Sequence, residues 1–142
     1  MKILVDTNRI IAALIKSGTT RGILFDDTFE FVTPDFTISE IREHEAELLR
    51  KTRLAKEEFE VLLALLFERI TVVPFSDYAH FLESFRNEIS DQDDTPHLAA
   101  CLASNAEGIW AHDPHFLEQD RVKVFTNIDM LRMSGKANEG EK

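Results

Sequence analysis

The sequence predicts an α/β fold: a three-layer α/β/α sandwich in which helices cover a mostly parallel central sheet of four or five strands. Short apolar runs typical of strands alternate along the chain with segments whose apolar residues recur every three or four positions. Such alternation is typical of crossover units that feed a parallel sheet. The length of 142 residues matches one domain, so we expect a folded domain over residues 1–134 and a flexible tail over residues 135–142.

Composition and charge exclude several classes of protein. Hydrophobic residues make up 44% of the chain and charged residues 30%, which is an ordinary globular balance. The net charge of −10 argues against general electrostatic binding of nucleic acid, which needs clustered Lys and Arg. Cys101 is the single cysteine and lies in an apolar stretch, so we interpret it as a core residue in a reducing compartment. No apolar run reaches the length of a membrane span and no secretory signal is apparent, so we expect a cytoplasmic protein without a membrane partner.

The first elements are a strand and a helix. The apolar run at residues 2–5 predicts a strand, which Asp6 closes. Apolar residues at helical spacing then predict a helix through Ile15, with Asn8 as its cap and Gly18 as its stop. Asp6 is therefore expected between a strand and a helix.

A second strand and a helical hairpin follow. Residues 21–26 predict a short helix, and the run at residues 29–33 predicts a strand that ends before Pro34. Apolar residues recur at helical spacing over residues 37–51 and again over residues 56–69, which predicts a helical hairpin. The densest basic segment falls at its turn, where we expect solvated side chains: Arg50, Lys51, Arg53 and Lys56.

The middle of the chain predicts a third strand and two helices. The β-branched run at residues 70–73 reads as a short strand. A helix carrying Tyr78 to Phe85 follows it. The acidic stretch at residues 91–94 then precedes an apolar helix that begins near Pro96 and runs through Ala103, which matches known helix-start chemistry.

The last elements complete the alternation. The run at residues 108–112 predicts a strand that Asp113 closes, and a short turn of helix follows over residues 114–118. Residues 122–126 predict a last strand. Asn127 is then expected to cap a final helix through Met133.

Four acidic residues are expected where this fold brings strand ends together. Asp6 and Asp113 close strands, Glu40 lies on the third helical segment, and Asp94 precedes an apolar helix. Ligands of open parallel sheets bind beyond the carboxyl ends of the strands. Carboxylates gathered in one pocket resist joint ionisation, and a hard dication with a preference for oxygen ligands relieves that repulsion. The pattern therefore predicts a site for a divalent metal ion.

Each acid also has a simpler interpretation, and only their combination favours a site. Asp6 and Asp113 are compatible with ordinary turns, and Glu40 with one of several solvated acids on its helix. Asp94 and its neighbours Asp91 and Asp93 are compatible with helix capping.

Four short motifs resemble those of the PIN-domain nucleases, a family that includes the toxins of VapBC-type toxin–antitoxin pairs. The motifs are Val5-Asp6-Thr7-Asn8, Ser39-Glu40-Ile41, Asp91-Gln92-Asp93-Asp94 and Ala111-His112-Asp113. The resemblance covers nearly the whole chain and implies a PIN-like fold with Mg²⁺ or Mn²⁺ as cofactor. It further implies that Asp6, Glu40, Asp94 and Asp113 are the catalytic metal ligands and that Asn8 orients them.

The sequence departs from the family pattern at two positions. The third acid of the family comes directly before the apolar helix, which corresponds to Thr95, so Asp94 lies one residue early. Asp93 and Asp91 therefore remain alternatives to Asp94. Ala111 replaces a hydroxyl residue found in many members, and such residues around a ligand set affect metal affinity.

The expected activity is that of a Mg²⁺- or Mn²⁺-dependent endoribonuclease that hydrolyses RNA phosphodiester bonds. A further expectation is that the protein is the toxin of a toxin–antitoxin pair. The alternative is a catalytically silent PIN-like module that binds a protein, such as an antitoxin or a second copy of the chain. The predicted hairpin favours a homodimer because it carries more large apolar residues than one buried face needs. They are Phe59, Leu62, Leu63, Leu65, Leu66 and Phe67.

Overall fold

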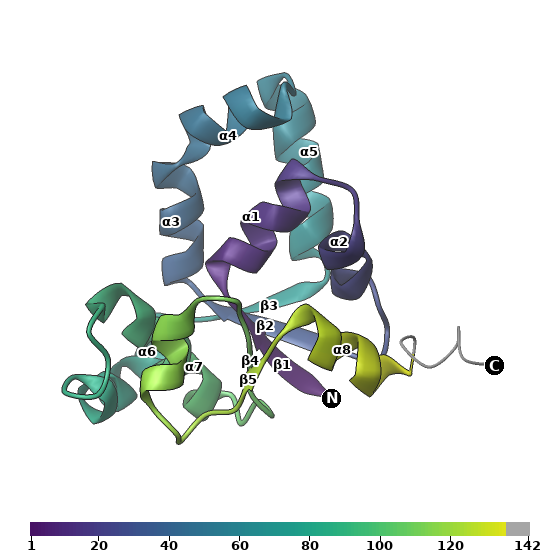
Figure 1. Cartoon of the computed structure of the whole chain (residues 1–142). Coiled ribbons are helices and arrows are strands. Elements are labelled where there is room, and N and C mark those ends of the chain that lie inside the picture. The colour runs from purple at the N-terminus through teal and green to yellow at the C-terminus, as the bar shows by residue number, and fades with distance from the viewer. Residues whose placement is uncertain (136–142) are drawn as a thin grey trace.

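The structure, a computed structural model that describes residues 1–135, has a central sheet of five parallel strands in the order β3-β2-β1-β4-β5 (Figure 1). The parallel α/β sandwich predicted from the sequence is confirmed. The strands are β1 (Lys2–Val5), β2 (Glu30–Pro34), β3 (Ile70–Val73), β4 (Ile109–Trp110) and β5 (Val124–Phe125).

Helices connect successive strands and cover both faces of the sheet. The α-helices are α1 (Thr7–Ile15), α2 (Thr19–Leu24), α3 (Phe36–Glu43), α4 (Glu45–Thr52), α5 (Lys56–Phe67), α6 (Phe75–Tyr78), α7 (Thr95–Ala103) and α8 (Asn127–Ser134). Short 3-10 helices are η1 (Ala79–Phe85), η2 (Gln92–Asp94) and η3 (Pro114–Glu118). In Figure 1, α3, α4 and α5 extend from one side of the sheet, whereas α6 and α7 lie on the other.

The alternation of side chains along each strand separates two apolar cores. Ile3 and Val5 of β1 pack with α1, α2, α4, α5 and α8 on one face. Leu4, between them, packs with α6, η1 and α7 on the opposite face. This is the expected result of a strand whose successive side chains point to opposite sides of a sheet. Cys101 lies in the second core, which confirms its interpretation as a buried residue.

The pairing of β1 with β4 brings the strand ends of the two motifs together. Leu4 aligns with Ile109 and Val5 with Trp110, and the Asp6 N–H donates to the Trp110 carbonyl oxygen at 3.1 Å. The residues that follow both strands therefore emerge at the same edge of the sheet.

The predicted single helix over residues 37–51 was wrong, since it is two helices that meet at His44. The N–H of His44 donates to the carbonyl oxygens of Glu40 and Ile41 at the end of α3. Between the buried residues Ile41 and Leu48 no side chain is buried. The turn at His44 therefore has no core contact that would hold one straight helix.

Two predicted caps were also displaced by one or two residues. Asp6, not Asn8, is the residue that precedes the first turn of α1. Thr126, not Asn127, caps α8: its Oγ1 accepts from the Asp129 N–H at 3.3 Å. The Asn127 side chain instead accepts from Trp110 Nε1 at 2.9 Å, so it ties α8 to β4.

Other boundaries shift by a few residues, and the helix predicted over Tyr78 to Phe85 is the short α6 followed by η1. Gly135, with φ of +81°, ends α8 in the left-handed conformation that glycine adopts readily. The rest of the tail predicted at residues 135–142 lies outside the described residues. Within the described part of the chain, no helix combines the length and the apolar character needed to cross a membrane.

Candidate metal centre

Asp6 lies at the centre of the site, between β1 and α1. Its side chain is buried, with the residue 3% exposed. Burial raises the pKa of Asp6 to about 7, and the Asp113 charge adds to the rise; the Arg9 guanidinium and the backbone N–H groups of Thr7 and Asn8 oppose it. A carboxyl group in this environment is costly to ionise in the absence of a cation.

Asp94 is the second buried acid, at the end of η2 and directly before α7. Burial raises its pKa to about 7, with further contributions from the charges of Asp113, Asp91 and Asp6. Oδ2 of Asp94 and Oδ2 of Asp6 are buried and have no hydrogen-bond partner among residues 1–135. Buried oxygens normally have partners, so two such oxygens at one edge of the sheet call for a ligand.

Glu40 reaches the site from α3. Its Oε1 accepts a hydrogen bond from Thr7 Oγ1 at 2.6 Å, which joins α3 to the first turn of α1. Burial raises the pKa of Glu40, and the charges of Asp6 and Asp93 add to the rise, whereas the hydrogen bond from Thr7 and the neighbouring imidazole of His97 oppose it. Glu40 is therefore coupled to Asp6 and is not a fully solvated acid.

Asp113 follows β4 and precedes η3. Its Oδ1 accepts from the backbone N–H of His115 at 2.9 Å, which fixes the carboxylate at the start of η3. The charge of Asp113 raises the pKa of both Asp6 and Asp94, so the three acids lie near one another. The structure thus places the four acids that the sequence singled out at one edge of the sheet, whereas the ligand atoms within 4.8 Å of one another among the described residues are those of Asp91, Asp94 and His115.

Two histidines bridge these acids in pairs. His97 Nε2 lies 3.7 Å from Asp6 Oδ1 and 3.5 Å from Glu40 Oε1. His115 Nδ1 lies 3.7 Å from Asp94 Oδ2 and 3.3 Å from Asp113 Oδ1. His97 is buried beneath the acids, whereas His115 is exposed at their rim.

The alternatives to Asp94 occupy different positions. Asp91 and Asp93 are exposed, and Asp91 caps η2 by accepting from the Asp93 N–H at 3.0 Å. Asp91 nevertheless belongs to the rim, since Asp91, Asp94 and His115 each offer one ligand atom and these atoms lie within 4.8 Å of one another. The charge of Asp93 instead favours the protonated forms of Glu40 and His97.

Sequence reasoning missed two residues of the site, and it left a third, Arg9, unranked among several basic residues considered for contact with phosphate. His97 was absent from the candidate set because a lone histidine in an apolar helix has no local signal of function. Thr7 lies in the Asp-Thr-Asn motif, but only the fold shows that its hydroxyl contacts Glu40 and His97. Arg9 is half-buried beside Asp6, and its Nε has no hydrogen-bond partner within the described chain. Asn8, predicted to orient the ligands, is exposed and reaches Asp6 through its backbone N–H.

The chemistry of the donor set fits a hard dication. Its members are carboxylates, with oxygen atoms that Mg²⁺ and Mn²⁺ prefer, and two of these oxygens are buried without partners. His97 does not supply a counter-charge, because burial lowers its pKa and keeps it neutral near pH 7. The guanidinium of Arg9 lowers the pKa of Asp6, but its single positive charge does not balance four acids.

Other basic residues are engaged elsewhere. Arg21 donates from Nε to the Ala13 carbonyl at 2.8 Å and so caps the end of α1. In the basic segment around the turn between α4 and α5, Lys51 pairs with Glu47 at 2.9 Å and Lys56 with Glu45 at 3.7 Å. This supports the interpretation of that segment as a solvated turn.

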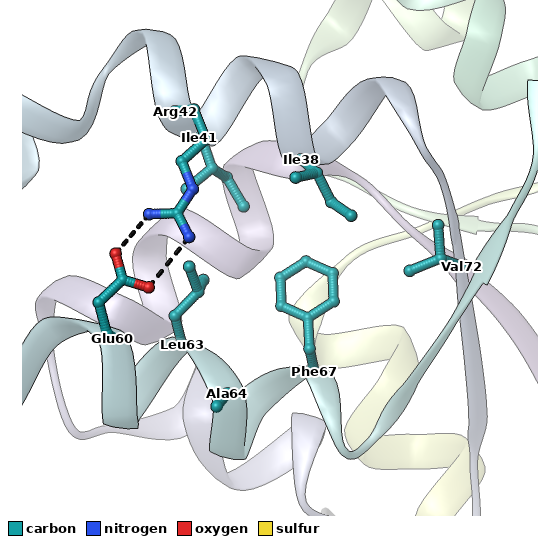
Figure 2. Close-up of a pocket in the computed structure, with 8 residues that line it drawn as sticks. All are labelled: Ile38, Ile41, Arg42, Glu60, Leu63, Ala64, Phe67 and Val72. Atoms are coloured by element: carbon teal, nitrogen blue, oxygen red, sulfur yellow. Dashed lines mark hydrogen bonds and ion pairs between the residues drawn. The ribbon is translucent and has the colours of Figure 1, made fainter.

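A separate apolar groove of about 360 Å³ lies between α3, α5 and β3 (Figure 2). Arg42 of α3 donates two hydrogen bonds to Glu60 of α5, at 2.6 and 3.0 Å, across one end of it. The groove contains none of the four acids. It is lined by Ile38, Ile41, Arg42, Glu60, Leu63, Ala64, Phe67 and Val72.

The fold is a parallel α/β sandwich, and its acids gather beyond the carboxyl ends of the strands. This arrangement is typical of the α/β domains that bind a ligand at that edge of the sheet. Within that class, the family model described as PIN domain matches residues 4–127, and the chain belongs to this family. PIN domains are generally metal-dependent nucleases, and the acidic cluster of this chain is compatible with that activity. A search of curated proteins found no match to the chain.

Proposed function

We propose that this protein is a Mg²⁺- or Mn²⁺-dependent endoribonuclease whose metal ligands are Asp6, Glu40, Asp94 and Asp113. The observation that carries the proposal is the pair of buried carboxylate oxygens, Oδ2 of Asp6 and Oδ2 of Asp94, that lack hydrogen-bond partners in the described chain. Membership of the PIN-domain family supports a nuclease in particular. Asp91 is the alternate ligand beside Asp94 that the rim geometry favours.

These acids would hold a divalent cation, which when bound would supply Lewis-acid activation of water and of the scissile phosphodiester. The positive charge of the cation would let the site accept an anionic substrate despite the net charge of −10 of the chain. The chemistry needs no side-chain nucleophile. Burial raises the pKa of the Cys101 thiol to about 12, so Cys101 stays protonated in the core.

Arg9 is the basic residue that we propose for contact with the RNA backbone. Its guanidinium lowers the pKa of Asp6, and the residue is half-buried, so part of its side chain is accessible beside the proposed metal ligands. Arginine recognises phosphate oxygens with two donors in a fixed plane. The basic residues of the turn between α4 and α5 pair with glutamates and are weaker candidates.

The test is cleavage of a labelled single-stranded RNA of mixed sequence by the purified chain, with Mg²⁺, with Mn²⁺ and with EDTA. We expect metal-dependent internal cleavage by the wild type and a loss of at least a hundredfold in Asp6→Asn and Asp113→Asn, with folding checked by circular dichroism. Equal cleavage by the wild type and both variants would assign the activity to a contaminant and contradict the proposal.

A second candidate function is protein binding, which exposed apolar side chains on α5 favour. Val61 is 60% exposed and Leu65 46% exposed, and they line a groove with Leu54 and Leu62. The other residues of the predicted patch are buried or half-buried, so the exposed surface is smaller than the sequence indicated. We propose that a second copy of the chain covers this surface in a homodimer.

A toxin role with an antitoxin protein as inhibitor is the further proposal for this site. A partner of that kind would block the metal centre. An antitoxin gene found beside the gene for this chain would support the toxin role. A cytoplasmic location is consistent with the single buried cysteine, which has no described partner for a disulfide.

A further inference from the structure

A chain of threonine hydroxyl groups lies beneath the metal centre and links β1 to α1. Thr33 Oγ1 donates to the Val5 carbonyl oxygen at 3.0 Å. Thr33 Oγ1 and Thr37 Oγ1 lie 2.9 Å apart, and Thr37 Oγ1 lies 3.0 Å from Thr7 Oγ1. All three threonines are buried, so their hydrogen bonds are made within the protein.

The chain ends at two groups of the site. Thr7 Oγ1 donates to Glu40 Oε1 at 2.6 Å. His97 Nε2 lies 2.9 Å from Thr7 Oγ1 and 3.3 Å from Thr37 Oγ1. His97 is 1% exposed, and its Nδ1 is buried without a hydrogen-bond partner among residues 1–135.

The direction of each hydrogen bond follows from the number of hydrogens available. A hydroxyl group has one hydrogen to donate, and a carbonyl oxygen or an ionised carboxylate can only accept. Thr33 gives its hydrogen to the Val5 carbonyl, so Thr37 must donate to Thr33. Thr7 gives its hydrogen to the Glu40 carboxylate.

Because Thr7 donates to the shorter contact with Glu40, no threonine hydrogen then remains for its contact with Thr37 or for its contact with His97. The 2.9 Å contact is a hydrogen bond only if His97 Nε2 carries the hydrogen and donates it. If the hydrogen were on Nδ1, the lone pair on Nε2 would compete with Glu40 for the single hydrogen of Thr7. Glu40 would lose its donor and the orientation that the donor imposes.

We propose that His97, as the Nε2–H tautomer, is a positioning residue that turns the Thr7 hydroxyl toward Glu40 and so aims the Glu40 carboxylate into the metal centre. The effect of His97 on metal binding rests on the proposed function, but its tautomer does not. Hydrogen-bond partners of metal ligands fix ligand orientation, and their removal typically lowers metal affinity about 10- to 100-fold.

The tautomer is measured first, by two-bond ¹H–¹⁵N correlation spectra of the histidine rings at pH 8.5, with EDTA and again with saturating Mg²⁺. A His97→Gln spectrum assigns the signals. We expect the Nε2–H pattern in both conditions. An Nδ1–H pattern, or that of a charged imidazolium, overturns the proposal whether or not the chain binds metal.

Calorimetric titration with Mn²⁺ then tests the positioning role. We expect His97→Leu and Thr7→Val each to weaken Mn²⁺ binding at least tenfold, and the double variant to lose no more than either alone, since both act through Glu40. His97→Gln, which keeps an N–H donor near the Nε2 position, should restore most of the affinity. Thr52→Val is the control, because Thr52 lies at the end of α4 outside this chain of hydroxyl groups, and it should bind Mn²⁺ as the wild type does.

Folding of each variant is checked by thermal denaturation. If His97→Leu does not fold, the Mn²⁺ affinities of the single variants Thr7→Val and His97→Gln are compared instead. Folded His97→Leu with wild-type Mn²⁺ affinity overturns the positioning role. A wild type that binds no Mn²⁺ contradicts the proposed function instead, and the spectra alone then decide the His97 assignment.

Discussion

Asp113 raises the pKa of Asp6 across the boundary between two neighbouring parallel strands. The two residues are more than a hundred positions apart in sequence, and the pairing of Val5 with Trp110 brings their strand ends to one edge of the sheet. Their repulsion, with the burial of Asp6, is the physical reason to expect a cation at this edge.

The first prediction is that the buried acids of the metal-free protein lose their stabilising contribution as pH rises from about 4 to 7. The folded-state pKa of Asp6 and of Asp94 is raised from 3.8 to about 7, so this contribution is fully present below pH 3.8, is lost progressively as pH rises toward 7 and changes little beyond about pH 8. His97, whose pKa is lowered, acts in the opposite sense below its unfolded pKa of 6.5, so the wild type is compared with an acid variant at each pH. Thermal denaturation in EDTA measures the effect.

Asp6→Asn is the matched variant for that measurement. It removes one ionisation and should raise Tm in EDTA at pH 8 by about 4–8 °C, for roughly 2 kcal/mol. Mn²⁺ should raise the Tm of the wild type and not that of the variant. A difference in Tm between Asp6→Asn and the wild type that is the same at pH 5 and pH 8 in EDTA contradicts the prediction.

The second prediction separates substrate binding from metal binding. Arg9→Gln should lower kcat/KM for RNA cleavage roughly tenfold to a hundredfold, because a charge-assisted contact with phosphate is lost. Its Mn²⁺ affinity should stay the same or increase, since the Arg9 charge repels a cation near Asp6. Lys51→Gln, in the solvated turn, serves as control and should cleave as the wild type does. Weaker Mn²⁺ binding by Arg9→Gln would show that Arg9 supports the metal ligands instead.

The third prediction concerns the close approach of β4 to β5. A Cβ on Gly108 would lie 2.6 Å from Phe125 Cε2 and 2.7 Å from the Lys123 carbonyl oxygen. Gly108→Ala should therefore destabilise the fold by about 1–3 kcal/mol. Gly22→Ala is the control, because Gly22 is helical with open space around its Cα, and it should be neutral or stabilising. Chemical denaturation compares the two, and equal stability would contradict the close approach.

The sequence predicted the layer order and the strands well, since their signals are local. The β-branched run Ile70–Val73 is β3 without a shift. The break at His44 was missed because apolar spacing on either side favours one helix, and only packing against the core shows that the middle turn has nothing to bury. Asn127 was expected to be a cap because its position before a helical pattern is a local signal. Its hydrogen bond with Trp110 forms only in the folded chain and has no such signal.

The acids of the site were found from their places after strands and before helices. His97 was missed because its chemistry depends on Thr7 and Glu40, which lie far away in sequence. Distances between side chains of separate elements are not present in any local pattern. The same limit applied to Arg9: the sequence alone could not rank it for contact with phosphate against other basic residues such as Arg21, whose side chain the structure shows to cap α1.

The fourth prediction tests the exposed side of α5. Val61→Asp with Leu65→Glu should convert a homodimer to a monomer, because both side chains are more than two-fifths exposed and would carry charge into an apolar interface. Light scattering after size exclusion measures the mass. Ile128→Asp on α8, equally exposed but remote in sequence, should leave the oligomeric state unchanged. A monomeric wild type excludes the proposed dimer.

The most direct measurement of the central claim is calorimetric titration of the metal-free chain with Mn²⁺ at pH 7.5, beside Asp6→Asn and the exposed-acid control Glu83→Gln. The claim predicts saturable binding by the wild type and by Glu83→Gln, and its loss in Asp6→Asn. Absence of binding by the folded wild type, or equal binding by Asp6→Asn, would contradict the existence of a metal centre built on Asp6.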